Sequence, residues 1–139
     1  MTGIDAWHAY IRSGDRAALH ELLDPDATFD SPIVHTTQRG CEITEAYLHA
    51  AATVLGGPDF RYTGEWTNET GAVLEFETII DGVTINGVDI IGLTDDGQRI
   101  AGFKVMIRPL KAVNLVHRLM GEALAAGAQV VRKSPIQSA

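Results

Sequence analysis

One carboxylate, Asp89, stands in the middle of the apolar stretch INGVDIIGL, residues 85–93, which has the composition of a buried strand. Burying an unpaired carboxylate costs several kcal/mol, a large share of the roughly 5 to 15 kcal/mol by which a domain is stable. We therefore expect Asp89 to be paired, protonated or directed into a wet cavity. In an apolar cavity the loss of hydration would raise its pKa toward the range in which a carboxyl group serves as an acid or base.

Two further side chains could assist Asp89. His35 stands at the end of a predicted strand over residues 27–35, and histidine titrates near neutrality, so it is our candidate partner for acid–base chemistry. The alternative is that His35 is polar surface. Ser31 lies on the same predicted strand but has no evident base beside it, and nucleophilic catalysis is not favoured.

Metal and cofactor motifs are missing from the sequence. The other four histidines show none of the HxH, HxxxH or HExxH spacings that metal sites use, so no metal site is predicted; they are residues 8, 20, 49 and 117. The sequence has no GxSxG, Walker or dinucleotide-binding fingerprint, and no cofactor is predicted.

The bulk composition limits the partners. A chain of 139 residues is long enough for one domain, and its net charge of −7 with a single basic pair, Arg132-Lys133, argues against nucleic acid and anionic membrane surfaces. The N-terminus lacks a secretory pattern and no apolar run has membrane-spanning length, so we expect a cytoplasmic protein. One cysteine, Cys41, is in keeping with a reducing compartment.

The first third of the chain predicts three helices around one strand. The first helix has Thr2 and Asp5 in a capping-box pattern, and the second spans about residues 15–23. The third follows Gly40 and runs to about Leu55, with Glu42, Glu45 and His49 predicted to face outward. Its predicted inward stripe is Ile43, Ala46, Tyr47, Ala50 and Val54.

From residue 60 the apolar period changes from 3.6 to 2 and remains so for about fifty residues. Turns at Asp81-Gly82 and Asp95-Asp96-Gly97 separate strands by short connections, which predicts an antiparallel meander. Helices followed by a meander predict an α+β domain over residues 1–127. It includes a C-terminal helix over residues 110–126, and residues 128–139 are predicted to be a loose tail.

Two motifs and the order of elements resemble a known superfamily. SGDRAALHELLDPDATFDSP, residues 13–32, has a Gly-Asp helix start and an Asp-Ala-Thr strand entry, and NGVDIIGLTDDGQRIAGFKVMIR, residues 86–108, has paired strands with an acidic-Gly turn. These resemble the nuclear transport factor two-like and SnoaL-like polyketide cyclase superfamily, which includes ketosteroid isomerase and limonene epoxide hydrolase. The resemblance covers residues 3–108. It implies a curved, mainly antiparallel sheet wrapped around the N-terminal helices as a cone with an internal pocket, and here the C-terminal helix is additional.

The resemblance transfers only one catalytic role. The position of the isomerase's general base is Ser31 here, and that of its helix-one tyrosine is Trp7, whereas its protonated aspartate corresponds to Asp89. The cyclase's base near the end of the last strand, residues 105–108, and the hydrolase's Arg-Asp-Asp set are also missing. Of the family's catalytic groups, the chain keeps the Asp89 carboxyl.

The cone geometry implied by the resemblance predicts the pocket. Apart from Asp89 the predicted lining is mostly apolar, as in many small-molecule sites. It consists of Phe29, Ser31, Phe76, Thr78, Ile91, Phe103, Val105 and Ile107, with Trp7, Tyr47 and Trp66 around them. The alternative is that these aromatics fill the cone as core, with Asp89 capped by a backbone or indole donor.

The outer face of the predicted sheet mixes charges with apolar residues. Val88, Ile90 and Met106 would be exposed there, and superfamily members use this face to form two-fold dimers, so we predict a homodimer. The C-terminal helix is then either a lid over the cone or part of the dimer contact.

The functional hypothesis is an enzyme of the isomerase, cyclase or hydrolase kind, acting on a small apolar molecule with Asp89 as acid or base and His35 or Ser31 assisting. The alternative is a non-catalytic dimeric module that binds or carries an apolar ligand. The missing family bases favour the module, and the inward acid favours the enzyme.

Overall fold

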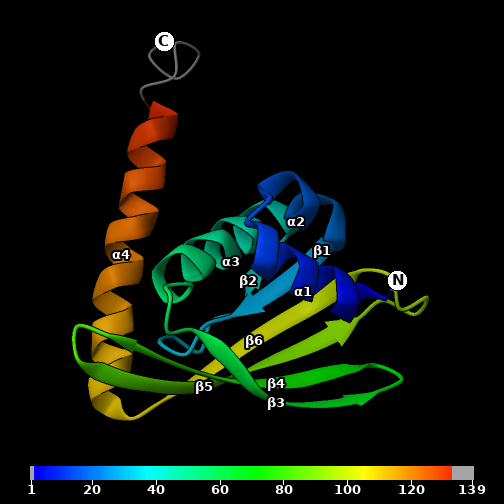
Figure 1. The fold of residues 1–139 in the computed structure, drawn as a ribbon. Coiled ribbons are helices and arrows are strands. Elements are labelled where there is room, and N and C mark those ends of the chain that lie inside the picture. Colours follow the sequence, from blue (N-terminus) through cyan, green and yellow to red (C-terminus); the bar gives the residue numbers. More distant parts are fainter. Residues whose placement is uncertain (1, 133–139) are drawn as a thin grey trace.

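The structure of the protein, a computed structural model, describes residues 2–132 of the chain. Helices α1, α2 and α3 cover one face of a single curved sheet, and α4 stands at one end of it (Figure 1). This arrangement confirms the predicted α+β cone with its additional C-terminal helix. The elements are α1 (Gly3–Ser13), α2 (Arg16–Leu22), β1 (Leu23–Asp30), β2 (Gln38–Arg39), α3 (Cys41–Leu55), β3 (Arg61–Asn68), β4 (Gly71–Ile80), β5 (Val83–Leu93), β6 (Ile100–Arg108) and α4 (Leu110–Arg132).

The sheet has six strands in the order β2-β1-β6-β5-β4-β3. Strands β3 to β6 form the predicted antiparallel meander, whereas β1 joins β6 in parallel and β2 pairs antiparallel with β1. Because side chains alternate across a strand, one face of each carries the core. Asp89 pairs with Leu74 on one side and Val105 on the other, so it lies on this buried inner face.

Helix α1 begins as its sequence predicts. The Thr2 hydroxyl accepts a hydrogen bond from the Asp5 backbone N–H, and the Asp5 carboxylate accepts one from the Thr2 backbone N–H. These bonds satisfy N–H groups that a helix start leaves free. Gly14 ends the helix with a φ of 68°, a conformation that glycine adopts without strain. The capped helix directs Trp7 and Tyr10 into the core.

Strand β3 contains a bulge between Tyr62 and Gly64. Tyr62 pairs with Phe76 on the inner face, but after the extra residue Trp66 pairs with Val73, which faces the other way. An inserted residue reverses the alternation of a strand. Trp66 is therefore 60% exposed on the outer face, and its ring lies so close to Gly64 that a Cβ there would come within 2.6 Å of it.

One predicted strand end and one predicted helix face were wrong. β1 ends at Asp30, so the loop from Ser31 onward replaces the second half of the predicted strand. α3 buries Thr44, Leu48, Ala50 and Leu55, which confirms Ala50 of the predicted stripe, whereas Ile43 is 37% exposed and the centre of the inner face is shifted by one residue. The reason is that α3 is apolar on more than one face.

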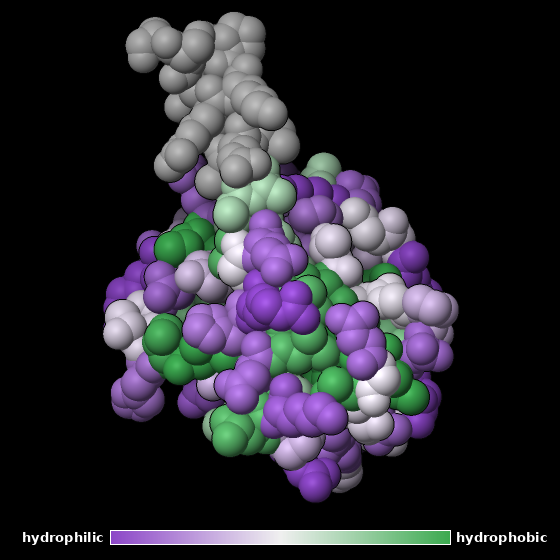
Figure 2. All heavy atoms as spheres, turned by 90° about the vertical axis from the view of Figure 1, so that its left-hand side faces the viewer, coloured by the Kyte–Doolittle hydropathy of each residue, from purple (hydrophilic) through white to green (hydrophobic). Residues whose placement is uncertain are grey.

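Helix α4 continues to Arg132 instead of ending at Gly127. The predicted loose tail therefore begins no earlier than residue 133, and the rest of it lies outside the described residues. α4 packs beside α3 and against β5 and β6, and its C-terminal turns extend past the sheet (Figure 1). Apolar and polar side chains are interleaved on the face that carries α4 (Figure 2). No helix among residues 2–132 is both long and apolar enough to cross a membrane.

Candidate functional site

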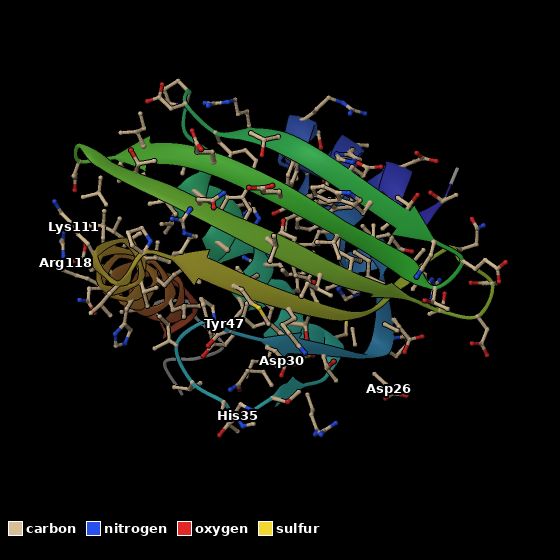
Figure 3. All side chains as sticks on the ribbon, turned by 90° about the horizontal axis from the view of Figure 1, so that it is seen from below. Asp26, Asp30, His35, Tyr47, Lys111 and Arg118 are labelled. Carbon is tan, nitrogen blue, oxygen red and sulfur yellow. The ribbon has the colours of Figure 1, made fainter. Side chains whose placement is uncertain are left out.

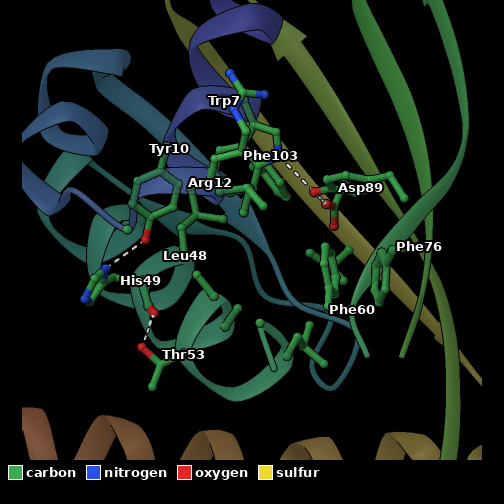
Figure 4. Close-up of a pocket in the computed structure, with 18 of the residues that line it drawn as sticks. Trp7, Tyr10, Arg12, Leu48, His49, Thr53, Phe60, Phe76, Asp89 and Phe103 are labelled. Atoms are coloured by element: carbon green, nitrogen blue, oxygen red, sulfur yellow. Dashed lines mark hydrogen bonds between the residues drawn. The ribbon is translucent and has the colours of Figure 1, made fainter. Parts of the chain in front are cut away.

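A cavity of 390 Å³ lies between helices α1 and α3 and the inner face of the sheet (Figure 4). Its volume falls within the range of about 300 to 1,000 Å³ that is typical of small-molecule sites. The wall is mainly apolar, with a few polar groups at separate places. The lining residues are Trp7, Tyr10, Ile11, Arg12, Ser13, Gly14, Leu48, His49, Ala51, Ala52, Thr53, Leu55, Gly56, Phe60, Tyr62, Phe76, Asp89, Phe103 and Val105.

Asp89 is the buried acid of this cavity, with 7% of its surface exposed. The Tyr62 hydroxyl donates a hydrogen bond of 2.6 Å to Asp89 Oδ2. The Trp7 indole Nε1–H in turn donates one of 2.9 Å to the Tyr62 oxygen. The three residues form a directed chain of donors that ends on the carboxyl group. Asp89 Oδ1 has no hydrogen-bond partner among residues 2–132, so one oxygen stays available for a ligand.

Burial controls the protonation of this group. Loss of hydration raises the pKa of Asp89 from 3.8 to about 7, against the opposing effect of the Tyr62 hydrogen bond, which favours the charged form. Burial also raises the pKa of Tyr62 far above its ordinary value, with the Asp89 charge as a second cause. Tyr62 therefore remains a donor, while Asp89 exchanges a proton near neutrality. A carboxyl group with such a pKa can give or take a proton at physiological pH.

A second polar pair lies in the same cavity. The Tyr10 hydroxyl and His49 Nδ1 are 2.7 Å apart. Burial raises the pKa of Tyr10 to about 12, and burial, followed by the nearby Arg16 charge, lowers the pKa of His49. The lowered pKa favours the neutral form of the His49 imidazole. Figure 4 shows this pair across the cavity from Asp89.

The sequence-predicted residues divide between two cavities. With Asp89, the wall of the 390 Å³ cavity includes four of them: Trp7, Phe76, Phe103 and Val105. Phe29, Ser31 and Tyr47 instead line a second cavity of 210 Å³, which α4 closes. Thr78 is buried on the inner face but lines neither cavity, and its hydroxyl has no hydrogen-bond partner within the described residues 2–132.

Two predicted residues lie away from Asp89. Trp66 is exposed on the outer face because of the β3 bulge. His35 is exposed on the loop after β1 and lines neither cavity. Figure 3 shows His35 beyond the β1 side of the sheet, whereas Asp89 belongs to β5, which lies on the other side of β6. The pairing of His35 with Asp89 was therefore wrong, because the strand that was to bring His35 inward ends at Asp30.

Ser31 has a structural role. Its Oγ accepts hydrogen bonds from the backbone N–H groups of Ile33 (3.1 Å) and Val34 (3.2 Å). These bonds hold the turn that follows β1. The Ser31 hydroxyl is therefore used by the backbone.

Sequence reasoning missed Tyr62, Tyr10 and His49. Tyr62 lies two residues after Phe60 in the alternating stretch, which places both side chains on the same face of the strand, but it was not assigned to the pocket. His49 was placed outside because the stripe of α3 was given the wrong phase. The spacing of Thr44, Leu48 and Leu55, at i, i+4 and i+11, would have indicated the correct face.

One possible metal-binding group also escaped the spacing rules. Among the described residues, the ligand atoms of His20, Cys41 and Glu45 lie within 4.8 Å of one another. The Glu45 carboxylate already accepts hydrogen bonds from Arg16 (2.8 Å) and His20 (2.6 Å), which gives the cluster an ion-pair role. None of the three lines the Asp89 cavity.

Solved structures show what this chain is similar to. It matches a steroid delta-isomerase from Pseudomonas aeruginosa at 32% identity and a TM-score of 0.84, covering 91% of this chain and 92% of that one. It matches an uncharacterised protein with a cystatin-like fold from Silicibacter pomeroyi DSS-3 at 27% identity and a TM-score of 0.82, covering 94% and 90%. A nuclear transport factor two-like protein of unknown function from Mesorhizobium loti matches at 18% identity and a TM-score of 0.65, covering 77% of this chain and 88% of that one.

Neither a protein-family model nor a curated protein sequence matches the chain. The first structural match nevertheless exceeds 30% identity over almost its whole length. The chain belongs to the nuclear transport factor two-like, SnoaL-like superfamily of cone-folded proteins. The resemblance that the two sequence motifs indicated is thereby confirmed.

Proposed function

We propose that the chain is an enzyme of the isomerase kind that binds an apolar, carbonyl-bearing small molecule in the 390 Å³ cavity and moves a proton within it. The observation that carries the proposal is the Tyr62-bonded Asp89, a buried acid with a pKa of about 7 in a mainly apolar cavity. The likeness to a steroid delta-isomerase supports the reaction class.

Asp89 would act on the carbonyl oxygen of the substrate. In its neutral form the carboxyl group can donate a hydrogen bond from Oδ1, the oxygen that Tyr62 does not contact. Negative charge develops on a carbonyl oxygen when a proton leaves the neighbouring carbon, so a donor at this place stabilises the transition state more than the ground state. The Trp7 and Tyr62 hydrogen bonds hold the carboxyl in position.

A turnover assay tests this function. The substrate is a steroidal β,γ-unsaturated ketone, whose isomerisation yields a conjugated ketone with strong ultraviolet absorbance. We expect Asp89→Asn to lower kcat/KM by at least about 100-fold, the usual scale for loss of a donor that stabilises charge on the carbonyl oxygen. Tyr47→Phe, which removes a hydroxyl from the second cavity, is the matched control and should leave kcat/KM within about twofold. Full activity of Asp89→Asn would contradict the proposal.

Ser31 favours a second candidate, a ligand-binding module without turnover. Its hydroxyl caps backbone N–H groups, so the position of the isomerase's base offers no acid–base group there. In that case the same ketone would bind to the wild-type protein and be recovered with its double bond unmoved. Conversion of the bound ketone by wild-type protein would exclude this candidate.

We also propose a homodimer through the outer sheet face. Trp66 and Met106 are 60% and 51% exposed there, and the half-buried Val73, Ile90 and Val88 connect them through cross-strand pairs. A two-fold contact between copies would cover them. Sedimentation velocity tests it: Met106→Glu should shift the protein to monomer, whereas Leu110→Glu, at an exposed site on α4, should not. A wild-type monomer would overturn the dimer.

A further inference from the structure

Three side chains that can bind a metal ion meet where helix α2 packs beside α3 (Figure 1). They are His20 of α2 and Cys41 and Glu45 of α3, and their ligand atoms all lie within 4.8 Å of one another. Cys41 and Glu45 are four residues apart, so the helix places them on one face. His20 comes from the last turn of α2. The packing of two helices therefore assembles this group, which no local spacing of histidines could indicate.

The separations of these atoms are close to those that one tetrahedral ion would impose. Zinc binds sulfur at about 2.3 Å and nitrogen or oxygen at about 2.0 to 2.2 Å, which places two ligands of a tetrahedron about 3.3 to 3.6 Å apart. Here His20 Nδ1 and Glu45 Oε1 are 2.6 Å apart, and no pair of ligand atoms is separated by more than 4.8 Å. Relative shifts of about 1 Å are sufficient for coordination. The side chain of His20 can supply them because it is 58% exposed.

The Glu45 carboxylate is already oriented for the role of a ligand. Its Oε2 accepts a hydrogen bond of 2.8 Å from Arg16 Nε, while its Oε1 faces the His20 ring. Carboxylates that bind metals are themselves held by hydrogen bonds from surrounding groups. Arg16 can keep its bond to Oε2 while Oε1 exchanges its contact with His20 for a metal ion.

The charges near the Cys41 sulfur favour a cation. Burial raises the pKa of the Cys41 thiol, and the carboxylates of Glu45, Glu42 and Asp24 raise it further, because each places negative charge near the sulfur. The same negative potential attracts a divalent ion. A metal ion that binds the sulfur replaces the thiol proton.

An ion can reach this group from solvent. His20 and Cys41 both line an open depression of 800 Å³ on the protein surface. Arg39 and Arg99 line the same depression, but neither is among the charges that shift the pKa of Cys41. The acidic groups therefore dominate at the sulfur.

We propose that His20, Cys41 and Glu45 form a binding site for a zinc-class divalent ion, which ties α2 to α3. One sulfur, one nitrogen and one oxygen ligand suit Zn²⁺, whereas Mg²⁺ and Ca²⁺ prefer oxygen ligands. Three protein ligands leave one position of a tetrahedron, which water from the depression can fill. None of the three residues lines the Asp89 cavity, so the metal site is independent of the isomerase activity.

Titration of the reduced, untagged protein with Co²⁺ tests the site. Co²⁺ replaces Zn²⁺ in tetrahedral sites and gives visible absorption bands, and a bound thiolate adds a charge-transfer band in the near ultraviolet. Because the chain has one cysteine, this band can come only from Cys41. We expect both kinds of band to saturate at one Co²⁺ per chain. Excess Zn²⁺ should remove them, whereas excess Mg²⁺ or Ca²⁺ should not.

Variants of the ligands identify the residues that hold the ion. Cys41→Ser should abolish the charge-transfer band. His20→Gln should weaken Co²⁺ binding at least about tenfold, since loss of even an indirect partner of a metal ligand costs about 10- to 100-fold. His8→Gln is the matched control, because it breaks a comparable 2.7 Å pair between a histidine and the Glu65 carboxylate, and it should leave the bands and the affinity unchanged.

Thermal unfolding gives a second measurement. Only the folded chain brings the ligands of α2 and α3 together, so binding should stabilise it. Excess Zn²⁺ should raise the Tm of the wild type by at least about 4 °C relative to a sample with chelator, and should leave the Tm of Cys41→Ser within about 1 °C.

Three results would overturn the proposal. Co²⁺ that does not bind would exclude the site. Binding without the charge-transfer band would mean that surface histidines hold the ion adventitiously. A charge-transfer band that His20→Gln leaves at wild-type affinity would mean that the thiolate binds without the α2 ligand.

Discussion

Two cavities lie next to each other in this molecule and share a wall made by Ala51, Leu55 and Val105. The larger holds Asp89, with its chain of donors, and the Tyr10–His49 pair. The smaller, closed by α4, is lined almost entirely by apolar groups, and its Ser31 hydroxyl is engaged by backbone. A curved sheet under helices leaves space at more than one place. What distinguishes a chemical site from a packing gap is the polar groups that the fold directs into it.

The largest expected difference between the cavities is in the pH dependence of stability. Because burial raises the pKa of Asp89 from 3.8 to about 7, the folded state binds this proton more tightly than the unfolded chain. The stabilisation is fully present below pH 3.8 and is lost as the pH rises through about 7. Relative to Asp89→Asn, the wild type should lose up to about 4 kcal/mol of unfolding free energy between pH 4 and pH 8.

Urea unfolding of both proteins at several pH values measures this difference. Tyr47→Phe, in the smaller cavity, should follow the wild-type pH dependence. A constant difference between wild type and Asp89→Asn across the range would mean that Asp89 does not take up a proton on folding.

The shared wall can be broken by Leu55→Ala. Leu55 is 8% exposed and lines both cavities, so its loss should join them and lower the unfolding free energy by about 3 kcal/mol. Urea unfolding gives the value, with Leu110→Ala on the α4 surface as a control that should change it by no more than about 0.5 kcal/mol. A cost below 1 kcal/mol would indicate that the wall collapses and the two spaces do not merge.

The donor chain can be shortened by Tyr62→Phe. This change removes the hydrogen bond that lowers the pKa of Asp89, so the pKa should rise further above about 7. A hydrogen bond to a charged group contributes about 1.5 kcal/mol or more, which corresponds to roughly one pKa unit. Carbon-13 NMR of the carboxyl group follows the titration. A fall in the pKa of Asp89 in Tyr62→Phe would contradict the stabilisation of the charged carboxylate by the Tyr62 hydrogen bond. The control Tyr47→Phe should leave the pKa of Asp89 unchanged.

The smallest effect is expected at Gly121, an α4 residue that lines the smaller cavity. A Cβ added there meets no atom within 4 Å, so Gly121→Ala should raise the unfolding free energy by about 0.5 to 1 kcal/mol through helix propensity alone. Gly87→Ala is the opposite control, because a Cβ there would come within 2.6 Å of the Met106 carbonyl oxygen and should destabilise. A destabilising Gly121→Ala would mean that the smaller cavity tolerates no added methyl group.

Much of the fold follows from local patterns in the sequence. The capping box at Thr2 and Asp5 and the period-2 stretch after residue 60 depend on near neighbours only, and the structure bears out both. The inward position of Asp89 follows from its place among large apolar residues. These features are visible because each is determined within a few residues of the chain.

The rest depends on contacts that a local pattern does not contain. The β3 bulge is defined by pairing with β4, so the alternation from Phe60 onward gave no warning that Trp66 would face outward. The elements that pack against α3 determine which of its faces is buried. Because α3 is apolar on several faces, its sequence alone is compatible with burial of either of two neighbouring faces. Trp66 was placed wrongly for the first reason and His49 was missed for the second, whereas Tyr62 follows the simple alternation and belongs to the site.

The bulge in β3 also has an evolutionary meaning. One inserted residue lets a single strand supply Tyr62 to the interior and Trp66 to the exterior, so changes at one need not disturb the other. Deleting Thr63 would remove the extra residue and make the pairing with β4 regular, and Trp66 would remain opposite Val73 on the outer face. Two aromatic residues four positions apart, which a regular strand would place on one face, are thus committed to opposite faces of the sheet by a single residue between them.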